Sequence, residues 1–113
     1  MRVAKITRTK KTVVKVVKLP DDLNMAISYL IKNDIDKRKA SHFIRMALVN
    51  RYTDKVEKIN VSKSTLELPD KYFFHIPSAL DKLMKKEKAF NGMTDQNIIV
   101  DSLRKTFIFT QFN

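Results

Sequence analysis

The feature that most constrains the fold is one β-strand pattern followed at once by two amphipathic helix patterns. Residues 12–19 read TVVKVVKL, and β-branched residues of this density favour a strand. The turn signal Pro-Asp-Asp comes next, and helical periodicity then continues to Tyr52. Because a lone strand is not stable in water, this unit must pair its strand with a second one.

The strand has two possible orientations. We favour the one in which Leu19 points inward, because a leucine directly before Pro20 can fill the space under the turn. Lys15 then shares the inward face and can extend its ammonium group to solvent from the strand edge. The alternative orientation buries Lys18 and exposes Lys15. In the favoured orientation the outward side chains are Thr12, Val14, Val16 and Lys18.

Two helices are predicted after this strand. The first covers about residues 22–32, and the second follows a turn at 33–36 with Asp36 as its cap. Apolar residues recur at the i, i+3, i+4 spacing of one buried helix face. These residues are Leu23, Ala26, Ile27, Leu30 and Ile31 in the first helix, and Ala40, Phe43, Ile44, Ala47 and Leu48 in the second. Residues 53–61 are expected to unwind into a linker.

The start of the second helix carries an unusual charge pattern. Lys37, Arg38 and Lys39 are expected in its first turn, where the helix dipole disfavours cations. An anion bound at the free backbone N–H groups of that turn would explain them.

Two short sequence patterns of the first half of the chain recur in the second half. Leu68-Pro69-Asp70 repeats Leu19-Pro20-Asp21 at a spacing of 49, and IIVDSL at 98–103 repeats FIRMAL at 43–48 at a spacing of 55. We expect a strand near residues 64–68 and a helix that begins at Pro77 and ends at Asn91-Gly92. A last helix capped by Thr94 should follow, and the C-terminal FIFTQF should pack on the core or on another subunit.

These patterns predict a mainly α fold with short β ribbons, in which β-α-α occurs twice. The two units are residues 1–59, with a basic N-terminal arm, and residues 60–113. The formal net charge is +11, from 23 Lys+Arg and 12 Asp+Glu. Residues 1–59 hold 15 basic and 6 acidic residues (+9), and residues 60–113 hold 8 and 6 (+2). An anionic polymer is therefore the expected partner, and the first half is its expected contact.

Several classes of protein do not fit this composition. Without cysteine, no disulfide framework or thiolate metal site can form. No apolar run is long enough to cross a membrane. His42 and His75 lie in different units and no catalytic motif accompanies them, so we predict no enzyme, no metal, no cofactor and no small-molecule substrate. We expect an intracellular location.

The first unit resembles the ribbon-helix-helix family of DNA-binding regulators. The resemblance rests on Leu19-Pro20-Asp21-Asp22-Leu23 after the strand and on Phe43-Ile44-Arg45-Met46-Ala47-Leu48 in the second helix, over residues 12–52. The second unit matches more loosely over residues 62–107. A cysteine-free chain with two such units looks like small regulators from archaeal viruses. This resemblance implies a location in the host cytoplasm, associated with DNA.

This resemblance implies a sequence-specific transcription regulator whose two-stranded ribbon enters the major groove of double-stranded DNA. The outward residues Thr12, Val14, Val16 and Lys18 would then contact bases. Second-helix N-termini would clamp phosphates, and the expected phosphate contacts are Lys10, Lys11, Lys15, Lys37, Arg38 and Lys39.

The second unit departs from the family pattern. Its outward strand positions would be Lys63, Thr65 and Glu67, and its last helix begins with Asp95 and no cation. We therefore expect this unit to be chiefly architectural. Pairing within one chain would set Glu67 beside Lys18, so a homodimer or higher homo-oligomer that pairs like strands is favoured over the intrachain ribbon.

Other functions remain open at this point. One alternative is a nucleoprotein that coats DNA without sequence choice, which the valine-rich strand allows. Another is an antitoxin-type regulator that binds a protein partner. Residues 1–10 can be a solvated basic tail or an arm that binds a groove.

Overall fold

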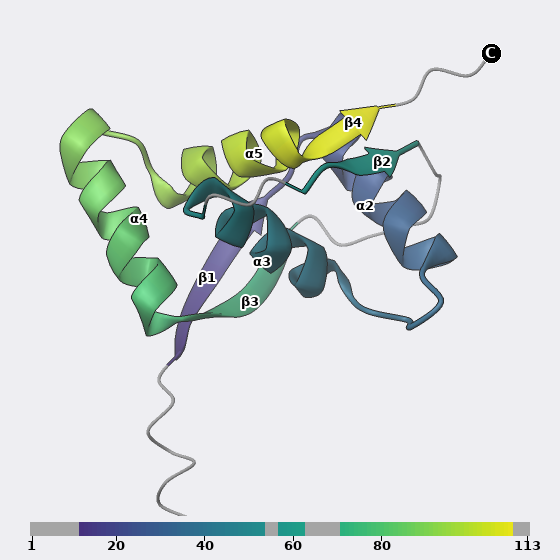
Figure 1. Ribbon diagram of the computed structural model, residues 1–113, viewed down its shortest axis with the longest axis horizontal. Helices are drawn as coiled ribbons and strands as arrows, with labels where there is room; N and C mark the ends of the chain where they lie inside the picture. Colours follow the sequence, from purple (N-terminus) through teal and green to yellow (C-terminus); the bar gives the residue numbers. More distant parts are fainter. Residues whose placement is uncertain (1–11, 54–56, 63–70, 110–113) are drawn as a thin grey trace, which may run out of the picture.

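The computed structural model describes residues 12–53, 57–62 and 71–109. It is a mixed α/β domain, mainly helical, with four helices and short strands in the described part (Figure 1). The elements in chain order are β1 (Thr12–Lys18), α2 (Asp21–Asn33), α3 (Ala40–Arg51), β2 (Ile59–Val61), β3 (Lys71–Pro77), α4 (Ser78–Asn91), α5 (Asp95–Thr106) and β4 (Phe107–Phe109).

β1 and β3 form a two-stranded antiparallel ribbon within the chain. Their register pairs Thr12 with Pro77, Lys15 with Phe74 and Lys18 with Lys71. Pairing of like strands between two chains was therefore the wrong prediction for this ribbon. That prediction rested on Glu67, which lies outside the described residues together with Lys63, Thr65 and the whole strand expected at 64–68. The observed partner strand carries no acidic residue, so the electrostatic objection to an intrachain ribbon disappears.

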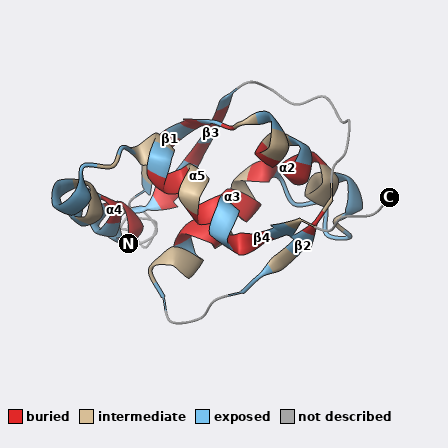
Figure 2. Cartoon of the chain, turned by 90° about the horizontal axis from the view of Figure 1, so that it is seen from above, coloured by how far each residue is buried: buried red, intermediate tan, exposed pale blue. Residues whose placement is uncertain are grey.

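The ribbon lies on one side of the molecule, and α3 and α5 lie against its inner face (Figure 2). The inner residues of β3 are the buried Tyr72, Phe74 and Ile76. The hydroxyl of Tyr72 also donates a 2.6 Å hydrogen bond to Asn24 Oδ1 of α2, which ties the ribbon to that helix. One hydrophobic cluster contains buried side chains from both predicted units, so residues 1–59 and 60–113 share a core.

The predicted echo between FIRMAL and IIVDSL corresponds to two helices of equal length, α3 and α5. Their buried faces match at the spacing of 55, with Phe43 and Ile44 in α3 and Ile98 and Ile99 in α5. Gly92 ends α4 with a left-handed φ of 73°, as Asn91-Gly92 predicted.

The Thr94 side chain caps α5 by accepting a 3.1 Å hydrogen bond from the backbone N–H of Asn97, also as predicted. Pro77 is the N-cap residue of α4, so the helix begins at Ser78, one residue after the predicted start at Pro77.

The start of α3 differs from the prediction. The helix begins at Ala40 with Lys39 as its N-cap residue, so Lys37 and Arg38 precede the helix and Asp36 does not cap it. Asp34 instead accepts a 2.6 Å hydrogen bond from the backbone N–H of Arg38. Lys37 adopts a left-handed conformation with φ 56°, which helical backbone does not allow.

Residues Ile59–Val61 form β2 rather than a linker, and β2 pairs in parallel with β4. The predicted packing of the C-terminal apolar segment is confirmed for Phe107, which is buried in the core, and for Phe109, which packs against it, whereas Ile108 is exposed. This small sheet lies on the opposite side of α3 and α5 from the ribbon (Figure 2).

Candidate nucleic-acid interface

The outer face of the ribbon is exposed along both strands. β1 contributes the predicted residues Thr12, Val14, Val16 and Lys18, all exposed, which confirms the favoured strand orientation. β3 contributes the exposed residues Lys71, Phe73, His75 and Pro77. Val14 is 57% exposed and Phe73 is 72% exposed. Exposed apolar surfaces that are rimmed by polar residues are typical of contact sites for another molecule.

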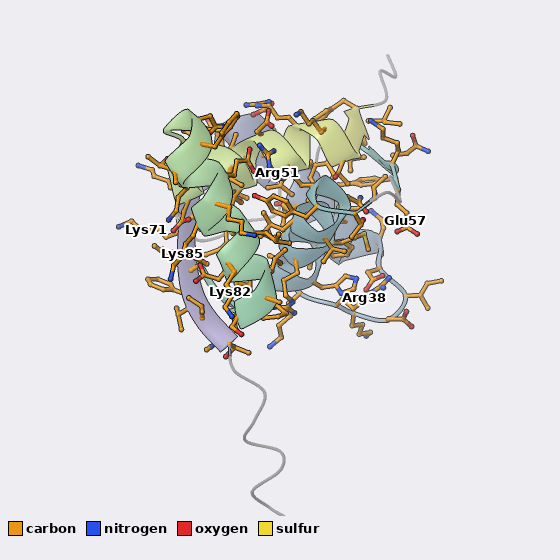
Figure 3. All side chains as sticks on the ribbon, turned by 60° about the vertical axis from the view of Figure 1, so that its left-hand side comes forward. Arg38, Arg51, Glu57, Lys71, Lys82 and Lys85 are labelled. Carbon is orange, nitrogen blue, oxygen red and sulfur yellow. The ribbon has the colours of Figure 1, made fainter. Side chains whose placement is uncertain are left out.

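Positive charge lies at one end of this ribbon. Lys18 and Lys71 are directly opposite each other in the register, and both are exposed. Figure 3 shows the Lys71 side chain extending away from the body of the molecule. Like charges in opposed positions destabilise a ribbon, and an anionic or electron-rich ligand would offset this repulsion.

The helices α3 and α5 hold the ribbon by contacts to its backbone. Arg45 of α3 donates a 3.1 Å hydrogen bond to the carbonyl oxygen of His75. Gln96 of α5 accepts a 2.9 Å hydrogen bond from the backbone N–H of Lys18, and its side-chain amide donates to the Lys18 carbonyl oxygen. These bonds fix both strands while leaving their outer side chains available for contact.

Lys15 is not a surface group. Its side chain is 8% exposed, and its Nζ lies 2.6 Å from Asp81 Oδ1 and 3.1 Å from Asp95 Oδ2. Burial alone would lower the pKa of Lys15, but the two carboxylates outweigh burial and raise the pKa above its ordinary value. The expectation that Lys15 reaches solvent and contacts a phosphate is therefore wrong, because the side chain is enclosed between β1, α4 and α5.

The basic loop before α3 is exposed and surrounds a hollow of about 380 Å³. Its lining includes Lys32, Lys37, Arg38 and Lys39. Arg38 is already engaged, since its Nη2 donates a 2.7 Å hydrogen bond to Asp34 Oδ1 and its Nε bonds the other carboxylate oxygen at 3.0 Å. This pairing lowers the pKa of Asp34 to about 2. Lys37 and Lys39 are exposed and remain the stronger phosphate candidates of the three.

The basic loop and the Lys71 end of the ribbon are separate. Arg38 and Lys71 lie on opposite sides of the molecule in the view of Figure 3. One small anion could not contact both.

Helix α4 presents positive charge at its surface, although the net charge of residues 60–113 is only +2. Lys82, Lys85 and Lys86 are exposed at the spacing of one helix face. Figure 3 shows Lys82 and Lys85 on the outside of this helix. The two acids of α4 face the interior instead: Asp81 pairs with Lys15, and Glu87 pairs with Arg51 of α3.

Arg51 of α3 joins three helices, because it pairs with Glu87 of α4 and with Asp101 of α5. Its side chain is 11% exposed and its Nη1 lies 2.6 Å from Asp101 Oδ2 of α5, while the other side of the guanidinium pairs with Glu87. The Tyr52 hydroxyl also donates a 2.6 Å hydrogen bond to Glu87. Arg51 is the first cause of the low pKa of Glu87, about 2 instead of 4.5. Both acids of α4 thus pair with basic residues of the first half, Asp81 with Lys15 and Glu87 with Arg51, while Lys82, Lys85 and Lys86 are exposed on the surface of the helix.

Two predicted phosphate contacts, Lys10 and Lys11, lie outside the described residues. The β3 residues of the outer face were missed because the Leu-Pro-Asp echo placed the second strand too early. The alternation of KYFFHIP, bounded by Pro77, was the signal that could have located the strand.

The two histidines are far apart in sequence and lie in different surroundings. His42 lies 3.1 Å (Nε2) from Arg38 Nη1, and its pKa is lowered by burial and by the charges of Arg38 and Arg45. His75 is exposed on the ribbon, with Nδ1 3.4 Å from the Thr12 hydroxyl. Within residues 12–53, 57–62 and 71–109, no group of three metal-ligating side chains gathers.

Over the same described ranges, no helix is long and apolar enough to cross a membrane. Comparisons with protein-family models, with curated proteins and with solved structures found no match.

Proposed function

We propose that this chain is a double-stranded DNA-binding transcription regulator of the ribbon-helix-helix type. The observation that carries the proposal is the β1–β3 ribbon, whose outer face is exposed on both strands and ends in opposed lysines. A two-stranded ribbon fits the major groove of B-DNA, which is about 12 Å wide. The succession of β1-α2-α3 and β3-α4-α5 supports a tandem arrangement in which one chain supplies both strands.

The side chains on the outer face suit contact with base edges. Lysine can donate to the O6 and N7 acceptors of guanine, and apolar side chains can contact the methyl group of thymine. Lys18 and Lys71 belong to the first class, and Val14, Val16 and Phe73 to the second.

The exposed lysines outside the ribbon suit contact with the phosphate backbone. Lys37 and Lys39 before α3, and Lys82, Lys85 and Lys86 on α4, would contact phosphates and position the ribbon without selecting a sequence. Lys15 is excluded from this role by its burial against Asp81 and Asp95.

A coating nucleoprotein is the second candidate. It is favoured by Val14, Val16, Phe73 and Pro77, since half of the outer positions carry no hydrogen-bonding side-chain group. Such a face can fill a groove while it discriminates among few bases.

The test is selection from a pool of random duplex DNA at near-physiological salt, with the bound fraction sequenced. Enrichment of a motif supports the regulator, whereas binding without enrichment supports the coating protein. Failure to bind any duplex refutes both and favours a protein partner, as in an antitoxin.

A charge-matched pair of variants makes the surface assignment specific. Lys18→Ala with Lys71→Ala should weaken duplex binding and reduce the salt dependence by up to about one unit per lysine that contacts a phosphate. The control, Lys58→Ala with Lys105→Ala, removes the same charge beside the β2–β4 sheet, on the other side of the molecule. Equal losses in the two variants would show that only net charge matters.

A further inference from the structure

The two ends of the ribbon differ in chemistry. One end pairs Lys18 with Lys71, and the other pairs Thr12 with Pro77. Among the paired residues that the structure describes, the first end carries two ammonium groups, while the second carries one hydroxyl and no charge. The apolar residues Val16 and Phe73 form the cross-strand pair next to the lysine end.

A ribbon built from two identical strands could not have this asymmetry. A two-fold axis through the central pair, Lys15 and Phe74, would place Lys18 in the position of Pro77 and Thr12 in that of Lys71. The other outward positions would match Val16 with His75 and Val14 with Phe73. No outward residue equals its counterpart, so the backbone is nearly symmetric and the contact surface is not.

We propose that the chain recognises a non-palindromic duplex site with a fixed polarity. This inference rests on the proposed function. Symmetric dimers select pseudo-palindromic operators because each half meets the same side chains. Here the lysine end should select guanine, the apolar middle should select thymine through its methyl group, and the Thr12–Pro77 end should discriminate weakly.

The polarity can be mapped directly, because the chain contains no cysteine. Asp21→Cys and Ala79→Cys each introduce one exposed thiol, three residues beyond Lys18 and two residues beyond Pro77 respectively. Each variant is coupled to an iron–EDTA cleavage reagent and bound to a duplex that carries the motif enriched from the random pool. We expect each probe to cut one flank of the motif, and the two probes to cut opposite flanks.

Three results would overturn the inference while leaving DNA binding intact. They are a palindromic motif, cleavage of both flanks by each probe, and binding without any motif. Absence of duplex binding would instead refute the proposed function itself, so the two failures are distinguishable.

Base preference at each end gives a second readout. Lys71→Ala should reduce discrimination for guanine at the lysine end by about tenfold and leave preferences at the other end unchanged. Thr12→Ala should change discrimination at the Thr12–Pro77 end by much less. Lys58→Ala, beside the β2–β4 sheet, is the control and should leave every base preference unchanged. Equal effects of Lys71→Ala at both ends would contradict a fixed polarity.

Discussion

Replacing Lys15 by methionine tests the buried ion-pair cluster that joins β1 to α4 and α5. Methionine keeps an apolar stem of similar length and removes the ammonium group. Asp81, whose side chain is 6% exposed, would lose its 2.6 Å partner and keep Lys85, at 3.3 Å and 67% exposed. Asp95 would keep Lys88 at 3.0 Å.

The expected loss in the free energy of unfolding of Lys15→Met follows from the burial of Asp81. Removing one partner of a buried ion pair costs about 3–5 kcal/mol, and the remaining lysines offset part of this loss. We expect the free energy of unfolding to fall by about 2–3 kcal/mol, a large share of the ~5–15 kcal/mol typical of a domain. The melting temperature should fall by about 10 °C.

Urea denaturation at pH 7 followed by circular dichroism measures this loss. Lys15→Met with Asp81→Leu is the companion variant, because replacing both charges by apolar groups is often neutral. The double variant should recover most of the lost stability. A Lys15→Met protein within about 0.5 kcal/mol of the parent, the range of ordinary surface substitutions, would refute the view that Asp81 depends on Lys15.

The pH dependence gives an independent check on the same variant. Lys15 is the first cause of the lowered pKa of Asp81, so Asp81 stabilises the folded protein above its ordinary pKa of 3.8 and loses this contribution as the pH falls. In Lys15→Met, burial should raise the pKa of Asp81. The stability gap between parent and variant should therefore narrow below about pH 4, and a gap that widens there would contradict the assignment.

Three further predictions address other parts of the chain. Because the pKa of Glu87 is lowered from 4.5 to about 2, its contribution is complete above pH 4.5 and lost as the pH falls toward 2. Glu87→Gln should destabilise the protein at pH 7, with a much smaller effect at pH 2.5 in urea titrations. Lys37→Ala with Lys39→Ala should weaken binding to all duplex sequences and lower the salt slope by about two; an unchanged slope in anisotropy titrations would remove this loop from the interface. Thr94→Ala should cost about 1 kcal/mol by removing the α5 cap, and Thr94→Ser should restore it in thermal melts.

Local patterns predicted most of the helices because their causes are local. The i, i+3, i+4 spacing in α3 and α5, the Gly92 C-cap and the Thr94 N-cap each depend on a few neighbouring residues. The orientation of β1 also followed from a local feature, the position of Leu19 directly before Pro20. These features place the predicted base-contacting residues on the exposed face.

The position of the partner strand and the burial of Lys15 depend on residues that are distant in the sequence. β3 lies in an aromatic run that follows Leu68-Pro69-Asp70, so the echo of the first unit pointed to the wrong segment. Lys15 is buried because it pairs with Asp81 and Asp95, which belong to helices far along the chain. No periodicity in β1 could indicate those two carboxylates. The start of α3 was misplaced for a more local reason, since Asp34 bonds Arg38 and Lys37 turns left-handed before the helix begins.

Intrachain pairing of β1 with β3 also has a thermodynamic consequence. A ribbon formed by two chains dissociates on dilution, so its population follows the square of the protein concentration at low levels. A ribbon closed within one chain is a unimolecular equilibrium, and its population is the same at one copy per cell as at thousands. The outer face should therefore be fully assembled as soon as a single chain has folded, and occupancy of a one-chain site should rise with the first power of concentration.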